Sequence, residues 1–304
     1  MTDQGASVIA RLKEKAARDG LQLQLLLNLF CQEEFLRRIQ KSRYGENLVL
    51  KGGFLLYSIS GYAGRPTIDA DYLLQNRSNE LGEVERMVAE IIQISGGAPF
   101  LRFEIKNLEL IAEQRKYNGI RVSLLGFINK TRTPFSVDFG VGDVVVPPPL
   151  KRVLPVLMPE FEQPEVLTYS LESVIAEKFD AIISRMELTS RMKDFFDIYY
   201  LAITCNFEGE KLREAISETL LNRKTYSTRN TISEIRQFSQ DRDMVIRWSA
   251  FCKKTLKCSM DFQGVLVVVT EFLEPVYAAI LAQEKFSGTW LKDKREWTED
   301  KSGR

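Results

Sequence analysis

Two aspartates one residue apart, Asp69 and Asp71, are the side chains of this chain best suited to chemistry on phosphate. Successive side chains of a β-strand alternate between its two faces, so an Asp-x-Asp pair on a strand presents both carboxylates to one side. Carboxylate oxygens are the ligands that Mg²⁺ and Mn²⁺ prefer in proteins. The pair therefore predicts a divalent-cation site of the kind that supports phosphoryl or nucleotidyl transfer.

A glycine pair, Gly52-Gly53, lies upstream of the acids and follows Lys51. Residues 47–50 are apolar and β-prone, and the residues after the glycines are expected to open a helix, so the pair marks a strand-to-helix turn. Backbone N–H groups at such a turn can hold phosphate oxygens, and the Lys51 ammonium can neutralise phosphate charge. A second strand, beginning near Thr67, is expected to carry the acids.

A third carboxylate is expected, because two divalent cations carry more positive charge than two acids offset. Asp138 is the best candidate, since it lies in the alternating segment 133–139, which predicts a strand followed by a turn. Asp143 is the second choice. On a strand beside the paired acids, Asp138 would complete the metal ligands and would orient an incoming hydroxyl group or accept its proton.

Each of these features also has an ordinary structural explanation. Asp-x-Asp pairs are common on surface strands, a glycine pair is more often a turn than a phosphate site, and a lone strand-end aspartate is usually solvated. The order of the features favours a site, because strand, glycine turn, helix and acidic strand follow one another, with Arg65 and Thr67 directly before the paired acids.

A second group of charged residues lies far downstream. Lys178 and Arg185 are seven residues apart and are expected near one face of a helix, while Asp194 and Asp197 share a face of the next helix. From spacing alone, ion pairs that fix the packing of the two helices are the preferred explanation. A role in binding substrate is the alternative.

The two groups together resemble the AbiEii/AbiGii toxin family, a MenT-like branch of the polymerase-β-like nucleotidyltransferases. The resemblance covers residues 48–201 and is carried by Lys-Gly-Gly at 51–53, Arg-x-Thr-x-Asp-x-Asp at 65–71, a Glu-Lys helix with an Arg at 177–185, and Arg-Met-Lys-Asp-Phe-Phe-Asp-Ile at 191–198. The family typically has Arg-Asp-x-x-Asp-Leu in the last motif. Lys193 and Ile198 are therefore mild departures.

The resemblance implies an α+β fold with two lobes. The first lobe, residues 1–165, would be a nucleotidyltransferase domain with a mixed or antiparallel sheet and bracing helices at its N-terminus. The second, residues 166–304, would be helical, complete the active site and bind RNA. The prolines at 147–149 mark the boundary between the lobes.

For activity, the resemblance implies a toxin that transfers nucleotides from an NTP to the 3′ end of tRNA, which stops translation. Mg²⁺ or Mn²⁺ would be held by the three acids. Nucleotide binding would involve the glycine turn and a set of charged residues, namely Lys51, Arg65, Lys178, Arg185 and Asp194. Asp197, or Asp194, would hold Lys178 or the substrate in place, so that Lys178 and Asp197 count among the catalytic residues.

The resemblance also implies a cognate antitoxin, which could be a kinase. Related toxins are silenced by phosphorylation of a hydroxyl residue just before the paired acids, and Thr67 has that position here. A phosphate on Thr67 would place negative charge beside Asp69. Ordinary strand propensity is the other explanation of this threonine. Alternative functions are a protein-nucleotidylating enzyme, an antibiotic-modifying enzyme, and a nucleotide-binding module without transfer activity.

Composition restricts the chemistry further. The chain of 304 residues has a net charge of +1 and no histidine, which excludes Ser-His-Asp and Cys-His hydrolysis and histidine-ligated zinc. Its four cysteines are scattered and are expected to be free thiols. We expect no signal peptide and no apolar run of membrane-spanning length, and so predict a cytoplasmic protein without a membrane partner.

Local patterns predict the remaining elements. Helices are expected over residues 6–18, 21–40 and 83–94, an antiparallel meander over 101–139, and almost only helix beyond 169, with a frayed tail from Trp290. Basic residues outnumber acidic ones over 211–257, where Tyr226 and Trp248 lie among them. This stretch fits an RNA-binding surface and a solvated helix surface equally well.

Overall fold

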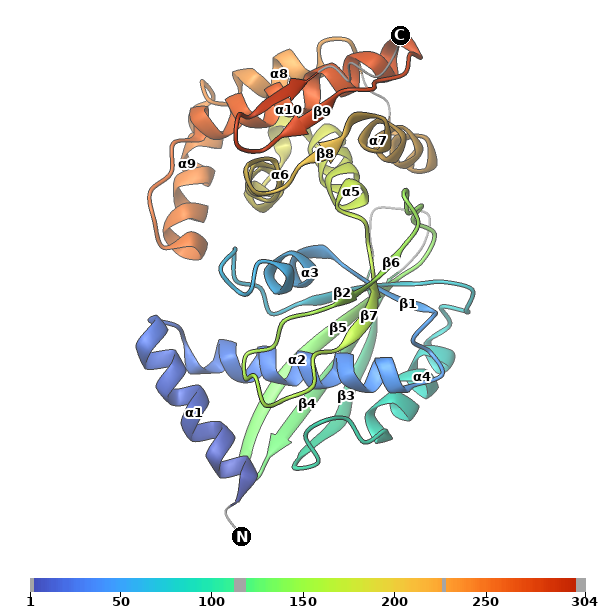
Figure 1. Ribbon diagram of the computed structural model, residues 1–304, viewed down its shortest axis with the longest axis vertical. Helices are drawn as coiled ribbons and strands as arrows, with labels where there is room; N and C mark the ends of the chain where they lie inside the picture. Colours follow the sequence, from blue (N-terminus) through green and yellow to red (C-terminus); the bar gives the residue numbers. More distant parts are fainter. Residues whose placement is uncertain (1–2, 112–118, 226–227, 299–304) are drawn as a thin grey trace. The chain divides into compact units, whose positions relative to one another are not determined.

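The computed structural model describes residues 3–111, 119–225 and 228–298 of the chain. The chain divides into two compact units, one formed by residues 1–142 and 150–168 and the other by residues 143–149 and 169–304 (Figure 1). The boundary predicted from the sequence is at residue 165. In the structure the first unit extends to 168, and the segment with the three prolines belongs to the second unit.

The first unit is built on a seven-stranded sheet with the order β3-β4-β5-β2-β1-β7-β6. Strands β2 and β5 are parallel, as are β1 and β7, and the other neighbours are antiparallel, so the sheet is mixed, as predicted. The strands are β1 Leu48–Lys51, β2 Ala70–Leu74, β3 Leu101–Ile111, β4 Gly119–Ile128, β5 Thr131–Gly140, β6 Leu150–Val153 and β7 Glu165–Thr168.

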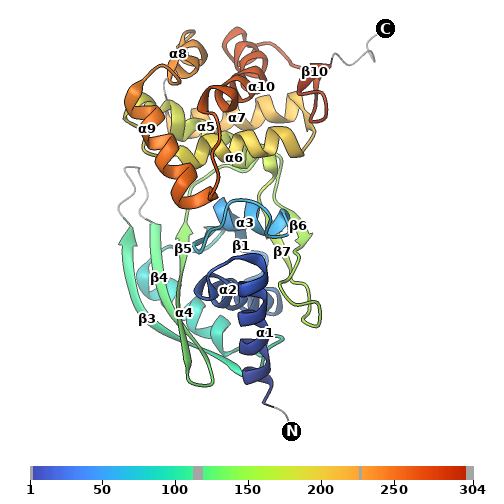
Figure 2. The same ribbon diagram turned by 90° about the vertical axis from the view of Figure 1, so that its left-hand side faces the viewer.

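Strands β3, β4 and β5 form the predicted antiparallel meander and run side by side (Figure 2). Strand β3 is continuous over residues 101–111, with a register shift between Ile105 and Asn107. Burial alternates along β5, where every second residue from Thr133 to Phe139 is buried. This alternation gives the sheet one apolar face and one less buried polar face.

Four helices complete the first unit: α1 Gln4–Asp19, α2 Leu23–Lys41, α3 Gly52–Ile59 and α4 Leu81–Gln93. Helix α2 contacts β5 and β7, and α4 contacts β3 and β4. Most of α2 is buried, including polar side chains such as Gln32, Glu33 and Glu34. A buried polar side chain requires hydrogen-bond partners, and those of α2 reach the segments that carry the predicted site.

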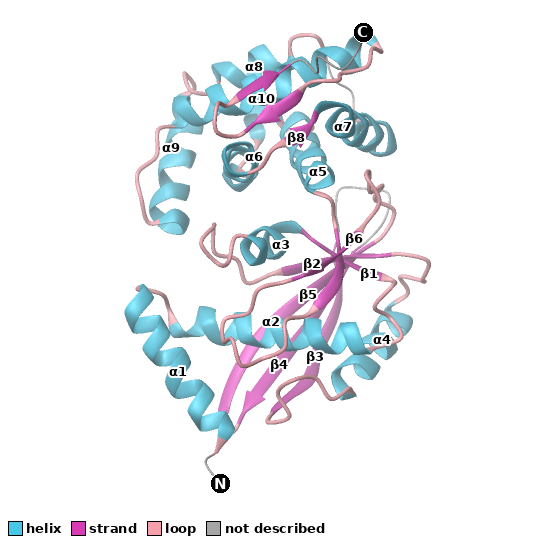
Figure 3. Cartoon of the chain, in the orientation of Figure 1, coloured by secondary structure: helices cyan, strands magenta, loops and turns pink. Residues whose placement is uncertain are grey.

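The second unit is mainly helical, as predicted (Figure 3). Its helices are α5 Leu171–Ile183, α6 Met192–Thr204, α7 Gly209–Arg223, α8 Thr231–Gln237, α9 Arg242–Phe251 and α10 Phe262–Ala282. A small sheet, not predicted from the sequence, has the order β10-β9-β8 and consists of β8 Phe207–Glu208, β9 Thr289–Leu291 and β10 Glu296–Thr298.

The expectation of a frayed tail from Trp290 is wrong over the part that the structure describes. Trp290 lies in β9 with 1% of its surface exposed, and its ring packs on Phe272 with the ring centroids 4.9 Å apart. Its indole Nε1 donates a hydrogen bond to the carbonyl oxygen of Ala202 at 2.7 Å. The tryptophan thus fixes the C-terminal hairpin to α6 and α10. The polar composition of the tail gave no indication of this packing.

Helix α10 also corrects an expectation. The sequence analysis expected no apolar run of membrane-spanning length, but this helix of 21 residues is long and apolar enough to cross a membrane by length and composition. Half of that stretch is buried inside the protein. Phe272 and Val276 are fully buried, as in the core helix of a helical domain.

Candidate active site

A row of four charged residues crosses the middle of the large sheet. The register pairs Lys51 of β1 with Asp71 of β2, Asp71 with Asp138 of β5, and Asp138 with Arg121 of β4. Paired residues on neighbouring strands point to the same face of a sheet. Tyr72, the residue after Asp71, is buried on the opposite face. The row therefore lies on the polar face, and Asp138 stands directly beside Asp71, as the sequence led us to expect.

Asp69 precedes β2, which begins at Ala70 and not near Thr67 as expected. The register of β2 and β5, continued by one residue, puts Asp69 opposite Ser136, whose hydroxyl donates to Asp69 Oδ1 at 3.5 Å. Gln32 holds this segment in place, because its Nε2 donates to the carbonyl oxygens of Ile68 at 3.2 Å and Ser136 at 3.1 Å. A fully buried glutamine of α2 thus positions the first acid.

The glycine turn touches the carboxylate of Asp71. Helix α3 begins at Gly52, two residues earlier than predicted, and Gly52 has a φ of +70°, which favours glycine. A Cβ atom on Gly52 would lie 2.2 Å from Asp71 Oδ2, so any larger residue would have to displace the Asp71 side chain. A Cβ atom on Gly53 would lie 2.9 Å from Arg65 Nη2 and 3.4 Å from Thr67 Oγ1. The structure thus brings together the residues predicted at the turn.

Arg121 is a charged residue of this face that was not predicted from the sequence. Its Nε donates to Asp138 Oδ1 at 2.8 Å and its Nη2 to Oδ2 at 2.7 Å, so the guanidinium engages both carboxylate oxygens. This hydrogen bonding, together with the charges of Asp138 and Asp69, raises the pKa of Arg121. The alternation of residues 120–128 could have placed Arg121 on the polar face, but only the register of β4 and β5 identifies its partner.

The donor set of this face fits a hard cation in part. Asp69 and Asp71 provide carboxylate oxygens next to the glycine turn, whereas both oxygens of Asp138 are engaged by Arg121. Within residues 3–111, 119–225 and 228–298, no three acids or cysteines are grouped closely enough to form a metal site by themselves. Asp143, the second choice for a third acid, is bound to Arg223 in the second unit.

A buried glutamate anchors the loop that leads to Arg65. Glu33 Oε1 accepts hydrogen bonds from the Tyr62 hydroxyl at 2.6 Å and from the backbone N–H of Leu157 at 2.7 Å. Burial raises the pKa of Glu33 to about 7, although both hydrogen bonds act in the opposite direction. The folded protein therefore binds a proton at Glu33 more tightly than the unfolded chain does.

This raised pKa predicts that the free energy of unfolding falls as the pH rises from 5 to 8. A carboxyl group with a raised pKa contributes most below its unfolded pKa and loses that contribution as the pH passes its folded pKa, here about 7. We expect a decrease of up to about 3 kcal/mol in urea unfolding experiments. Glu33→Gln should remove this pH dependence, and an unchanged pH profile in this variant would contradict the assignment.

In the second unit, the predicted charge group forms a buried ion-pair cluster. Lys178 Nζ lies 2.6 Å from Asp197 Oδ2 and 3.3 Å from Asp194 Oδ1, and all three side chains are buried. Asp194 also pairs with Arg191. Arg185 does not share the helix face with Lys178, because α5 ends at Ile183 and leaves Arg185 exposed beyond it.

Two residues of the basic stretch 211–257 are structural and not available to RNA. Arg223 is inside the unit, where burial lowers its pKa but the charges of Glu177, Asp143 and Asp180 outweigh burial and raise it. Trp248 is 2% exposed, donates to the carbonyl oxygen of Met260 at 2.7 Å and stacks on another ring. Trp248 is therefore not available to stack on an RNA base, and Tyr226 lies outside the described residues.

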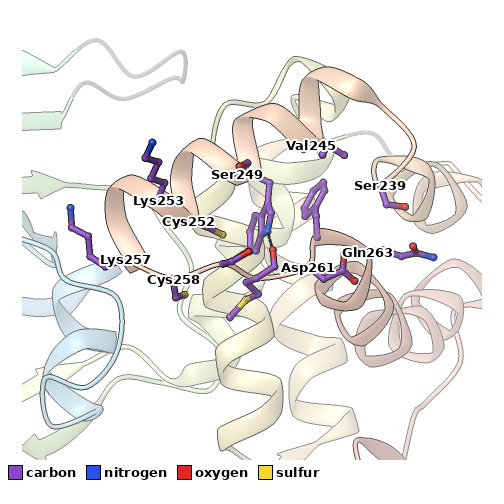
Figure 4. A pocket seen from close by; sticks show the side chains of 13 residues that line it. Ser239, Val245, Ser249, Cys252, Lys253, Lys257, Cys258, Asp261 and Gln263 are labelled. Atoms are coloured by element: carbon purple, nitrogen blue, oxygen red, sulfur yellow. Dashed lines mark hydrogen bonds between the residues drawn. The ribbon is translucent and has the colours of Figure 1, made fainter.

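Three of the exposed lysines in the same stretch lie close together in the sequence. Lys253 and Lys254 lie in the π-helical turn after α9, and Lys257 comes directly after that turn. None of the three forms an ion pair with another described residue. Lys253 and Lys257 line a pocket of about 710 Å³ between α9 and the start of α10, with Ser249 and Cys252 beside them (Figure 4). Unpaired lysines gathered at a pocket favour binding of an anion.

Comparison with known proteins identifies the family. The family model described as the nucleotidyl transferase AbiEii toxin of a Type IV toxin–antitoxin system matches residues 34–270. The chain belongs to the AbiEii family of nucleotidyltransferase toxins. The predicted family and enzyme class are confirmed, and the match includes both the acidic face of the sheet and the Lys178 cluster. No curated protein matches the chain significantly.

One solved structure agrees with this family at the level of the fold, and two others show weaker similarity. MenT4, a nucleotidyltransferase toxin from Mycobacterium tuberculosis, is 15% identical, covers 92% of this chain and 99% of its own, and gives a TM-score of 0.52. Two Helicobacter pylori proteins are each 17% identical. JHP933 covers 86% of this chain and 96% of its own with a TM-score of 0.48, and a putative nucleotidyltransferase covers 88% and 100% with 0.47. The match to MenT4 confirms the nucleotidyltransferase fold predicted for this AbiEii member.

Proposed function

We propose that this AbiEii toxin transfers nucleotides from an NTP to the 3′ end of tRNA in the cytoplasm and depends on Mg²⁺ or Mn²⁺. The observation that carries the proposal is the contact between the Gly52 turn and the carboxylate of Asp71, in register with Lys51 and Asp138. This arrangement puts a glycine turn, the Lys51 ammonium and carboxylates on one face of the sheet, which suits binding of a triphosphate.

The residues have separate roles in this proposal. The backbone N–H groups of the glycine turn, with Lys51 and Arg65, hold the phosphates. Asp69 and Asp71 would hold the divalent ion, with Asp138 as a third ligand once it leaves Arg121, and the ion would supply charge stabilisation for the leaving pyrophosphate. The acceptor hydroxyl oxygen forms a bond to the α-phosphorus, the bond to pyrophosphate breaks, and the hydroxyl proton passes to a base, for which Asp138 is the candidate.

The test is incubation of the purified protein with Mg²⁺, each α-labelled NTP in turn, and either total tRNA or total protein. Label at the 3′ end of tRNA supports the proposal. Label on protein would mean that the acceptor is a serine, threonine or tyrosine hydroxyl and not tRNA. No incorporation with any NTP, in a preparation that is folded by circular dichroism, would contradict nucleotidyl transfer to either acceptor.

From the family motif we infer that Lys178 helps to bind the nucleotide phosphates. The ion pairs of Lys178 give this residue a structural role as well. We expect Lys178→Met to abolish transfer and to lower the free energy of unfolding by about 3 kcal/mol, because it leaves Asp197 buried without its cation. Both roles predict this outcome. The double variant Lys178→Met with Asp197→Asn separates them.

The double variant no longer contains the unpaired buried charge, so we expect it to regain most of the lost stability. If Lys178 binds phosphate, transfer stays absent in this restored protein. Recovery of transfer together with stability would show that Lys178 acts only through the packing of α5 and α6. Urea unfolding and label incorporation, measured on the same preparations, give the two readouts.

The lysines at 253, 254 and 257 are our candidates for contact with the RNA backbone. Replacing all three by glutamine should raise the KM for tRNA about tenfold and make it less salt-dependent, with the KM for NTP unchanged. The matched control is the variant with Lys292, Lys294 and Arg295 of the C-terminal hairpin replaced by glutamine. An equal effect of both triple variants would mean that net charge, and not this surface, determines RNA affinity.

Family membership implies a cognate antitoxin, and we propose that it restrains the toxin by phosphorylating Thr67. The hydroxyl of Thr67 lies close to Gly53, so a phosphate there would occupy the phosphate-binding turn and repel the acids. Thr67→Glu should lower transfer strongly, with Thr67→Val as the control of similar shape. Full activity of Thr67→Glu would contradict this regulation.

A further inference from the structure

The pairing of Arg121 with Asp138 engages both oxygens of the third acid and places a positive charge beside them. The guanidinium binds both carboxylate oxygens in a fork geometry, at 2.8 and 2.7 Å, and the Asp138 side chain is only 16% exposed. Such bidentate pairs are the strongest ion pairs that arginine forms. Any cation that uses Asp138 must therefore compete with Arg121.

The charges around the pair explain why an arginine is there. Asp71 and Asp138 are directly opposite one another on parallel strands, and Asp69 lies two residues before Asp71. Like charges in such positions destabilise a sheet, and the guanidinium offsets this repulsion. Arg121 also has a second acidic neighbour, because the register of β3 and β4 pairs it with the exposed Glu109 on its other side.

We propose that Arg121 is a positioning residue. It binds Asp138 when no divalent cation is present, and it turns to Glu109 when that cation binds. The inference rests on the proposed function, since it concerns the cation that nucleotidyl transfer would use. Asp138 then has two arrangements, one bound to Arg121 and one available to the metal. The apparent affinity for the cation is reduced by the fraction of protein in the first arrangement.

The test is titration of the protein with Mn²⁺ followed by electron paramagnetic resonance, without nucleotide or RNA. Arg121→Gln should bind Mn²⁺ about tenfold more tightly than the wild type, because the competing cation is gone. Arg132→Gln, at the far end of β5, removes the same charge outside the row and should leave Mn²⁺ affinity within about twofold. Glu109→Gln should weaken binding about twofold to threefold, since Arg121 then has only Asp138 as a partner.

A double-variant cycle separates competition from a general effect of charge. In an Asp138→Asn background, Arg121→Gln should no longer change Mn²⁺ affinity, because there is no carboxylate left to compete for. The proposal is overturned if Arg121→Gln leaves Mn²⁺ binding unchanged or weaker, or if it strengthens binding equally in the Asp138→Asn background. If the wild type transfers label with Mg²⁺ while Arg121→Gln gives either of these results, the proposed function stands and only the role of Arg121 is overturned. A wild type that neither binds Mn²⁺ nor transfers label overturns both.

Discussion

Asp71→Asn should lower the rate of nucleotidyl transfer by about a thousandfold or more while the protein stays folded. The substitution preserves the shape of the side chain, which packs closely against the Gly52 turn. A Cβ atom added to Gly52 would lie 2.2 Å from Asp71 Oδ2. It removes the negative charge that would hold the divalent ion, a loss that acts directly on the transition state. Label incorporation into tRNA under saturating NTP measures the effect.

The matched control is Glu85→Gln, which removes one negative charge from the exposed surface of α4 in the same unit. We expect this variant to retain wild-type activity, and both variants to unfold within a few degrees of the wild type. If Asp71→Asn kept more than a tenth of wild-type activity, the acidic face of the sheet would not be the catalytic centre.

Glu34→Gln should lower the free energy of unfolding by about 3 to 5 kcal/mol, the largest stability effect that we expect from a single substitution. The Glu34 side chain is fully buried and accepts hydrogen bonds from Arg37 Nε at 2.8 Å, Arg38 Nε at 3.1 Å and the Gly97 backbone N–H at 3.1 Å. Neutralising it leaves two buried guanidinium groups without a countercharge. Urea unfolding followed by circular dichroism measures the change.

The buried network also connects α2 to the sheet. Arg38 donates to the carbonyl oxygen of Leu101 at 2.6 Å and to that of Ile92, which joins α2 to β3 and α4. Glu160→Gln is the control, because its pair with Arg11 lies on the surface and should contribute less than about 1 kcal/mol. Similar effects of both substitutions would show that burial of the Glu34 network does not determine stability.

The sequence predicted those parts of the site that depend on local pattern. Alternation of apolar and polar residues identified the meander and placed Asp138 on a strand, and the order of glycine turn and Asp-x-Asp pair indicated one phosphate-binding region. The structure brings Gly52, Gly53, Arg65, Thr67 and Asp71 together. Chain order predicts such neighbours, because a short connection between a helix and the next strand keeps its ends close.

Features that depend on register and burial were not predictable from one sequence. Nothing in the sequence distinguishes Arg121 from other arginines on strands. Only the pairing of β4 with β5 shows that it lies opposite Asp138. Trp248 lies among basic residues in the sequence, but tertiary packing buries it, and Trp290 is buried in the same way within a polar tail. Arg185 was assigned to a helix that ends at Ile183, since helix ends are the least certain part of a periodic pattern.

The most direct measurement of the central claim is a crystal structure with Mn²⁺ and a non-hydrolysable NTP, with the metal located by its anomalous scattering. We expect a manganese peak within bonding distance of the Asp71 and Asp69 carboxylates, with the triphosphate on the backbone N–H groups of Gly52 and Gly53. A nucleotide bound elsewhere, or manganese bound away from both aspartates, would contradict the account.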